Sequence, residues 1–322
     1  MMRGAAVAVI LMLAFSSAGW AEWYKGNTHT HTNISDGDSS PDVAVKWYKD
    51  HGYRFVVMTD HNKTGDGGMQ VVYGEPGKFL VITGNEISCS SEKKPVHLTA
   101  IAPSDSLNPV NDSTRVITLQ KNVNAIRKAG AVPVINHPNF VWAFGAGEMG
   151  QVTGWSLLEI ENSHPMVHNR GGIGKPSTEE MWDALLTKGM KIYGVASDDT
   201  HGYKDFTPFR ANPGRGWVCV RSDDLTPGAI CAALDKGDFY SSTGVELEDV
   251  TFDAASVSVK IKPAGVTAYV VEFIGKGGKV FAAMPGPEAS YRITGKEGYV
   301  RARISDSNGF HAWTQPVFVG GK

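Results

Sequence analysis

The sequence lacks the features that mark several common classes of protein. Its 31 Lys and Arg residues are balanced by 33 Asp and Glu residues and form no basic tract, so we expect no nucleic-acid partner. Beyond the first 21 residues, no segment is apolar enough to span a bilayer. The chain contains no Gly-x-Ser-x-Gly segment and no P-loop, so neither a serine-hydrolase nucleophile nor a P-loop phosphate site is expected.

Cysteine is also scarce. The three cysteines, Cys89, Cys219 and Cys231, cannot all pair with one another. An exported protein could join Cys219 to Cys231 in a disulfide, but each lies in an apolar context that suits a buried thiol equally well. The sequence leaves both alternatives open.

The N-terminal segment has the pattern of a secretory signal peptide. Arg3 supplies a positive start, residues 5–15 are apolar, and residues 16–21 are small apart from Trp20. We therefore expect a signal peptide over residues 1–21, a mature chain that begins near Glu22, and a periplasmic or secreted location. No stable membrane insertion is expected after cleavage, and an uncleaved anchor is the alternative.

Short apolar segments alternate with amphipathic ones between residues 24 and 244. Helix-start signals precede three of the expected helices, which are 41–51, 177–189 and 226–237. A fourth helix is expected at 115–129, where apolar residues recur on one face. The expected strands are 25–31, 54–59, 79–86, 97–102, 131–136, 156–161, 191–197 and 216–221. Strands separated by helices indicate parallel pairing, in a βα barrel or a doubly wound sheet.

After Gly244 the pattern changes to short alternating strands separated by Gly and Pro turns. These strands are expected at 250–252, 257–261, 268–273, 279–283, 290–293, 299–304 and 312–318. Their spacing predicts a small all-β, sandwich-like domain over residues 245–322 that follows an α/β domain over residues 22–244.

Side chains able to bind metal ions recur where the expected strands of the α/β part end. They are His29, His31, Asp36, Asp60, His61, Glu86, His137, Asp199 and His201, while His97 lies at the start of its strand. The catalytic face of a βα barrel gathers the C-terminal ends of all its strands, so the barrel is the favoured architecture. Imidazole and carboxylate suit Zn²⁺, Mn²⁺ or Fe²⁺, and such a cluster could hold two or three cations for hydrolysis.

The motifs resemble those of one known family. Segments 26–37 (GNTHTHTNISDG) and 57–62 (VMTDHN) resemble the opening signature of the polymerase and histidinol phosphatase (PHP) superfamily, and those around Glu86, His97, His137 and Asp199 resemble its later motifs. The resemblance covers residues 24–244 and implies a distorted (β/α)7 barrel with a two- or three-metal site. The leader, the β-rich tail and segments 214–217 and 239–244 are similar to the exported CehA/McbA branch, which includes a carbamate-cleaving enzyme.

The resemblance also implies a ligand set. His29, His31, Glu86 and Asp199 would hold a first cation, and Glu86 would bridge to a second. The ligands of the second would be His97 and His137, and those of a third would be Asp36, His61 and His201.

Other residues are assigned less direct roles. Asp198 and Asp60 are expected beside the ligands, Asp60 orienting His61 or a neighbouring imidazole, and Glu161 could support a ligand histidine. Glu86, Asp199 and His201 are the expected catalytic residues, with His201 a candidate to protonate the leaving group. Candidate substrate contacts are His164, Arg210 and Arg215.

These observations predict an exported metal-dependent phosphoesterase that hydrolyses small phosphomonoesters or phosphodiesters by a metal-bridging hydroxide. The leader argues against two cytoplasmic roles of the family, histidine biosynthesis and polymerase proofreading. Hydrolysis of an amide, ester or carbamate by the same site is the first alternative. A non-catalytic metal- or glycan-binding protein is the alternative of another class.

Overall fold

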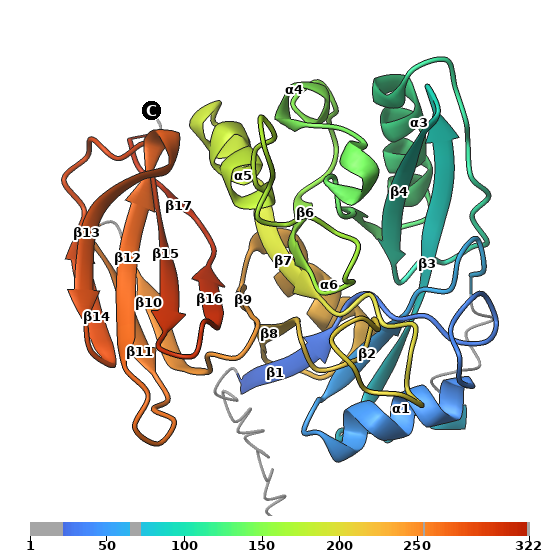
Figure 1. The fold of residues 1–322 in the computed structure, drawn as a ribbon, viewed down its shortest axis with the longest axis horizontal. Coiled ribbons are helices and arrows are strands. Elements are labelled where there is room, and N and C mark those ends of the chain that lie inside the picture. The colour runs from blue at the N-terminus through green and yellow to red at the C-terminus, as the bar shows by residue number, and fades with distance from the viewer. Residues whose placement is uncertain (1–21, 65–71, 254, 321–322) are drawn as a thin grey trace, which may run out of the picture.

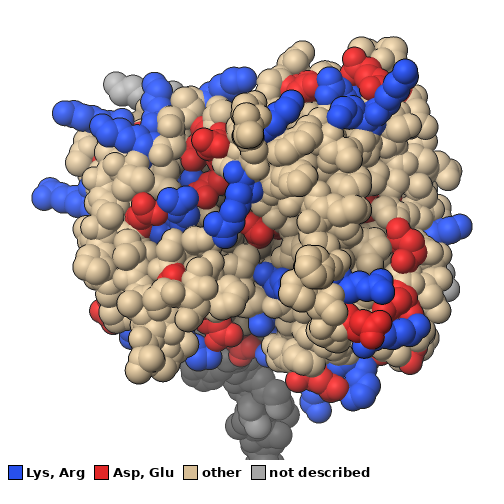
Figure 2. Space-filling view, viewed as in Figure 1, with Lys and Arg blue, Asp and Glu red and all other residues tan. Residues whose placement is uncertain are grey.

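The computed structural model describes residues 22–64, 72–253 and 255–320, so the expected signal peptide lies outside the described residues. Within these ranges, no helix is long and apolar enough to cross a membrane. The described chain forms a mixed α/β region followed by antiparallel β structure (Figure 1). On the face drawn in Figure 2, Lys and Arg side chains are interspersed with Asp and Glu.

A mixed sheet forms the α/β region. Its strands run in the order β8-β1-β2-β3-β4-β5-β6-β7, and β1–β2, β2–β3, β5–β6 and β6–β7 pair in parallel. Their bounds are β1 (Glu22–Asn27), β2 (Phe55–Met58), β3 (Leu80–Ser91), β4 (Lys94–Ile101), β5 (Val132–Ile135), β6 (Leu157–Asn162), β7 (Tyr193–Ser197) and β8 (Trp217–Ser222). The sheet curls, because Thr30 after β1 forms a parallel bridge with Thr200 after β7.

Antiparallel strands interrupt the expected alternation of parallel strands and helices. β4 runs antiparallel to both β3 and β5, and β8 runs antiparallel to β1 and to β9 (Phe239–Ser242), a strand that the sequence did not predict. The parallel part of the sheet and the mixed α/β class are as predicted. A regular alternation over the whole region is not.

The four predicted helices are present as α1 (Pro41–Asp50), α3 (Arg115–Lys128), α5 (Thr178–Thr187) and α6 (Pro227–Lys236). Ser177 and Glu180 form the predicted capping box of α5, and Gly237 ends α6 with a left-handed φ of 83°. Two short elements that carry no strong sequence signal, η1 (Phe140–Trp142) and α4 (Ala146–Met149), follow β5.

The C-terminal β region consists of two antiparallel sheets that share one apolar cluster, which includes Val257, Val271 and Phe273. One sheet contains β10 (Leu247–Phe252), β11 (Ser256–Ile261) and β14 (Glu288–Arg292). The other contains β13 (Lys279–Pro285), β12 (Tyr269–Gly275), β15 (Tyr299–Asp306) and β16 (His311–Thr314), with β17 (Val317–Phe318) beside β15 and the short η2 (Lys276–Gly278) between β12 and β13. β16 pairs with β9, so hydrogen bonding is continuous across residue 244, and a domain boundary there stays a prediction.

The structure answers the question of the cysteines, since all three are free thiols. Cys219 packs into the cluster that includes Tyr48 and Trp217, whereas Cys231 packs with Val218 and Val220. Neighbouring residues of a strand face opposite sides, so the two thiols lie on opposite faces of β8. Burial raises the pKa of Cys219 and of Cys231 to about 12.

Candidate metal centre

The nine side chains predicted as metal ligands come together at one end of the curled sheet. Seven of them line a cavity of about 200 Å³, together with Phe140, His164, Met166 and Val167. The other two, His29 and His31, are completely buried and contact the cavity-lining carboxylates of Glu86 and Asp199. The fold thus brings together side chains that are more than 100 residues apart in the sequence, such as His29 and Asp199.

His29 and His31 lie just beyond β1, not within it, because the strand ends at Asn27. The extended backbone continues, since the Thr59 amide donates to the Thr30 carbonyl and the His31 amide donates to the Thr200 carbonyl. Side chains alternate along such a segment, so both imidazoles face the cluster while Thr30 does not. Their ring centroids are 5.1 Å apart.

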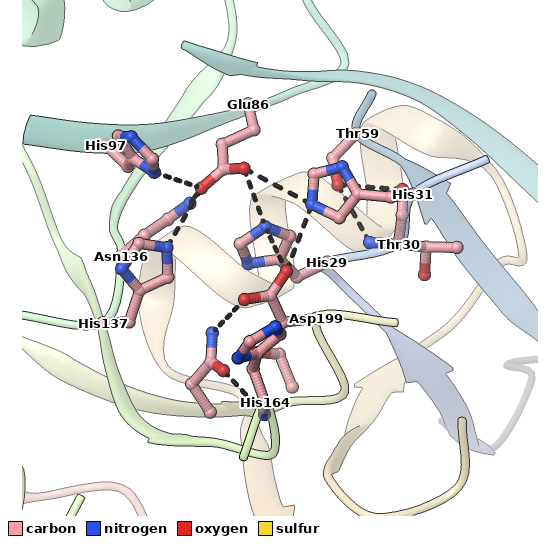
Figure 3. Close-up of polar contacts among 12 residues, drawn as sticks. His29, Thr30, His31, Thr59, Glu86, His97, Asn136, His137, His164 and Asp199 are labelled. Carbon is pink, nitrogen blue, oxygen red and sulfur yellow. Dashed lines mark hydrogen bonds and ion pairs between the residues drawn. The ribbon is translucent and has the colours of Figure 1, made fainter. Parts of the chain in front are cut away.

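Glu86 occupies the centre of the cluster (Figure 3). Its Oε2 lies 3.3 Å from Nε2 of both His29 and His31 and 2.9 Å from Nδ1 of His61. Its Oε1 lies 3.2 Å from Nδ1 of His97 and 3.1 Å from Nε2 of His137. The two oxygens thus face two different sets of imidazoles, as a carboxylate that bridges two cations must.

The position of His97 follows from the β3–β4 hairpin. Because β4 is antiparallel to β3, the start of β4 lies beside the end of β3, and His97 pairs with Ser88. The parallel strands bring their C-terminal ends to this edge of the sheet, and the reversed strand brings its N-terminal end there. The irregularity noted in the sequence is therefore a change of strand direction.

Three buried polar atoms at the cluster have no hydrogen-bond partner of acceptable geometry within the described ranges: Nε2 of His29, Nε2 of His31 and Oδ1 of Asp199. Oδ1 lies 3.2 Å from the first nitrogen and 3.1 Å from the second. Buried polar atoms are rarely left unpaired, and one divalent cation between these three would satisfy them all. The residues present therefore fit a metal ion.

Three groups of side chains offer donor atoms close enough to share an ion. They are His29, His31 and Asp199; His29, Glu86 and His137; and His31, Asp36, His61 and His201. These groups resemble the predicted sets with three differences: the first lacks Glu86, the second has His29 in place of His97, and the third also includes His31. The ligand roles, the metal and the number of ions stay predictions.

The charges of the cluster explain its protonation when no ion is bound. Burial lowers the pKa of His29, but the carboxylates of Asp199, Glu86 and Glu159 overcome this effect and raise the pKa well above its ordinary value. Burial also lowers the pKa of His61, but hydrogen bonds with Asp36 and Glu86 outweigh this effect and raise the pKa to about 10. Protons on the imidazoles thus balance the carboxylates, and a metal ion would displace them.

Glu159 is a buried residue of the site that the sequence did not single out. Its Oε1 lies 2.7 Å from Nδ1 of His29 and accepts from Ser197 Oγ, and its Oε2 accepts from the His137 amide. We expected Glu161 in this supporting role, which was wrong. A β-bulge between Glu159 and Glu161 turns Glu161 away, where its Oε1 accepts from Asn169 and burial raises its pKa to about 7.

The two other expected supporting carboxylates hold loops. Asp198 accepts hydrogen bonds from the backbone amides of residues 214, 215 and 216, whereas Asp199 faces the cluster, as the spacing to His201 predicted. Asp60 accepts from Thr32 and Ser35 and so fixes the loop that carries Asp36. Within the described residues Asp60 has no hydrogen bond to His61, so its expected orientation of that ring was wrong. Its link to a neighbouring imidazole is indirect, because Ser35 Oγ donates to Asp60 at 2.8 Å and lies 3.5 Å from Nδ1 of His31.

The three candidate substrate contacts fare differently. His164 lines the cavity, and its ring centroid lies 5.4 Å from that of His201. Arg215 does not line the cavity, because its guanidinium donates to the carbonyls of Thr207 and Arg210 and to Asn212. Arg210 is exposed and also lies outside the cavity lining, so neither arginine lines the cavity of the described chain, and contact of Arg210 with a substrate stays a prediction.

Comparison with known proteins places the fold. No family model and no curated protein matches the chain. It is similar to a two-domain protein from Bacteroides vulgatus that contains a predicted PHP-like metal-dependent phosphoesterase, with 16% identity over 92% of this chain and 96% of that chain and a TM-score of 0.53.

Two further solved structures cover less of this chain. One is a protein from Bifidobacterium adolescentis assigned as a metal-dependent phosphoesterase (14% identity, 62% of this chain, 92% of that chain, TM-score 0.42). The other is an amidohydrolase from Chromobacterium violaceum with bound sulfate and no metal (13% identity, 58% of this chain, 93% of that chain, TM-score 0.38). The CehA/McbA branch stays a prediction, and the likeness to the Bacteroides vulgatus protein shows that the two chains share a fold.

Proposed function

We propose that this protein is a metal-dependent hydrolase and that its substrates are small phosphomonoesters or phosphodiesters. The observation that carries the proposal is the position of Glu86, whose two oxygens face separate sets of imidazoles beside three unpartnered buried donor atoms. Zn²⁺, Mn²⁺ or Fe²⁺ bound here would lower the pKa of water and offset negative charge on a phosphate. We also infer that the curled sheet corresponds to the distorted seven-stranded barrel of the family.

The chain's own residues prepare the ligands. If Nε2 of His29 is to hold a cation, its proton must be on Nδ1, and Nδ1–H then donates to Glu159 at 2.7 Å. His201 is oriented in the same way, because its Nδ1–H donates to the carbonyl of Asp199 at 2.9 Å and leaves Nε2 on the side of Asp36. If no cation is bound by His201, its Nε2 is free to hold a proton for the leaving oxygen.

His164 is proposed as a substrate contact. The Met166 amide donates to its Nδ1 at 3.2 Å, so a neutral ring carries its proton on Nε2. Burial lowers the pKa of His164, which favours that neutral form. Nε2–H is then a hydrogen-bond donor for a substrate oxygen within the cavity.

A phosphate is favoured over a carbonyl substrate because several cations can each bind one of its oxygens, whereas a carbonyl needs only one Lewis acid and an oxyanion site. An amide, ester or carbamate remains the alternative. A protein that only binds a metal or a glycan would not need a carboxylate shared between two groups of imidazoles. Export, through residues 1–21, is part of the proposal.

The test is an assay of the purified chain after reconstitution with Mn²⁺ or Zn²⁺. We expect hydrolysis of nitrophenyl phosphate or bis(nitrophenyl) phosphate, and its loss on chelation. Activity confined to nitrophenyl acetate would replace the phosphoesterase by an esterase. A His29→Ala, His31→Ala double variant that keeps full metal content would overturn the ligand assignment.

A further inference from the structure

One wall of the cavity is apolar. Phe140 of η1 and Met166 and Val167 of the loop between β6 and α5 line the cavity beside the metal ligands. The centroid of the Phe140 ring lies 5.5 Å from that of His137 and 6.4 Å from that of His97, so the wall adjoins the imidazoles that face Glu86. Met166 is 57% exposed. Apolar side chains that line a cavity are available to pack against an apolar part of a ligand.

The cavity offers no cationic side chain of permanent charge. None of the residues that line it within the described ranges is Lys or Arg. A second phosphate or carboxylate on a substrate is normally held by Arg or Lys. Here such a group, if it lay against the apolar wall, would have no permanently charged side chain to compensate it.

The apolar wall is preformed. Nδ2 of Asn139 donates to the carbonyls of His168 and Pro176, at 3.0 and 2.9 Å, and so ties η1 to the loop between β6 and α5. The rings of Trp142 and His168 stack with centroids 4.8 Å apart and make a second tie. Because both sides of the wall are fixed before binding, little ordering is needed when an apolar group packs there.

We propose that the site selects esters whose leaving group is uncharged and apolar, an aryl-bearing or branched alcohol that packs against Phe140, Met166 and Val167. The proposal rests on the proposed function for the nature of the scissile bond. The selectivity itself comes from the wall and applies to whichever ester the site hydrolyses.

Binding of non-hydrolysable phosphonates to the Mn²⁺-loaded chain tests the selectivity, measured by isothermal titration calorimetry. Benzylphosphonate should bind about tenfold more tightly than methylphosphonate, because its ring is removed from water against the wall. A 2-carboxyethyl phosphonate should bind no more tightly than methylphosphonate. Equal affinities for the benzyl and methyl compounds, or tightest binding of the carboxyethyl compound, would overturn the proposal.

Three variants locate the effect. Met166→Gln should reduce the benzyl-to-methyl affinity ratio by about fivefold, and Met166→Leu should preserve the ratio, since only the glutamine places a polar group on the wall. Val266→Gln is the matched control, because Val266 is fully exposed in the C-terminal β region. An unchanged ratio in Met166→Gln would show that this wall does not recognise the ring.

Paired substrates separate this inference from the proposed function. Benzyl and methyl phosphate release alcohols of similar acidity, so a higher kcat/KM for benzyl phosphate reports recognition of the ring. Equal values with clear turnover would overturn the selectivity and leave the phosphoesterase standing. Faster turnover of benzyl acetate than of methyl acetate, with neither phosphate hydrolysed, would overturn the phosphoesterase and leave the selectivity standing.

Discussion

The protein contains two clusters of buried charge, and they are neutralised in different ways. In the candidate metal centre, the carboxylates of Glu86 and Asp199 face imidazoles, whose charge depends on pH. Between α5 and β15, in what we term the arginine cluster (Glu179, Asp183, Arg301 and Arg303), the carboxylates face guanidinium groups. Arg301 is completely buried and donates from Nε and Nη2 to both oxygens of Asp183, at 2.9 and 2.7 Å.

This difference gives the two clusters different roles: one can exchange protons for a cation, and the other attaches the C-terminal β region to α5. Imidazoles can give up their protons, so the metal centre can trade them for a cation. A guanidinium keeps its charge at every relevant pH, so the arginine cluster cannot exchange its cations in this way and instead attaches the C-terminal β region to α5. α5 begins directly after the loop that carries His164 and Met166, so this attachment also supports one side of the cavity.

The largest effect should come from Glu86→Gln, which keeps the shape of the side chain but removes the shared negative charge. We expect turnover to fall on the order of 10³-fold, with a loss of bound metal, because both sets of imidazoles lose their common carboxylate. Metal analysis and steady-state assays measure this, with circular dichroism to verify folding. The control is Glu92→Gln on the same hairpin, where the carboxylate is 45% exposed. Full metal content in Glu86→Gln would show that this cluster is not the metal centre.

The arginine cluster should respond in stability and not in metal content. Arg301→Met leaves Asp183 buried without its cation, which should lower the free energy of unfolding by about 3–5 kcal/mol. Urea denaturation of the metal-loaded chain measures the loss. Adding Asp183→Leu to Arg301→Met should restore most of it, because the uncompensated charge is then gone. A decrease in the free energy of unfolding of less than about 1 kcal/mol would mean that this buried ion pair contributes no more than a surface ion pair.

Two glutamates of β6 offer a sharper comparison within the metal centre itself. Glu159→Gln should weaken metal affinity about 10–100-fold, because Glu159 fixes the ring of His29 through Nδ1. Glu161→Gln should leave metal affinity unchanged, since the bulge turns that side chain away from the cluster. Competition with a chromogenic chelator measures both. Equal effects of the two substitutions would mean that the bulge does not separate their roles.

The sequence was sufficient for the features that depend on local patterns. Helix-start signals located α1, α5 and α6, and an apolar face located α3. Most of the side chains that gather at the cavity could be named because donor side chains follow apolar segments. The sequence was insufficient where one residue changes the geometry. Regular alternation along β6 puts Glu159 and Glu161 on the same side, and only the bulge separates them.

Pairings over long distances were also beyond the sequence. Arg301 and Asp183 are 118 residues apart, and nothing local marks them as partners. Arg215 had the right chemistry for a phosphate, but its guanidinium is used up by the carbonyls of Thr207 and Arg210. Side-chain chemistry therefore predicted which groups could act, and tertiary contacts decided which of them do.

The smallest effect expected is a pH dependence that differs between the metal-free and metal-loaded protein. In the folded metal-free chain, burial lowers the pKa of His61, but hydrogen bonds with Asp36 and Glu86 raise it to about 10, from about 6.5 for an unperturbed histidine. A pKa raised by folding stabilises the fold fully below the unfolded value, and this stabilisation is lost as the pH rises through the folded value. The metal-free protein should therefore lose stability between about pH 6.5 and 10.

The metal-loaded protein should behave in the opposite sense over this window, because a rising pH removes the protons that compete with the cation. Thermal unfolding at several pH values, with Mn²⁺ and with a chelator, tests the contrast. Arg301 does not titrate in this range, so Arg301→Met should lower both curves by an amount that does not vary with pH. Parallel curves with and without metal would mean that imidazole protons and the cation do not compete, and the distinction between the two clusters would then fail.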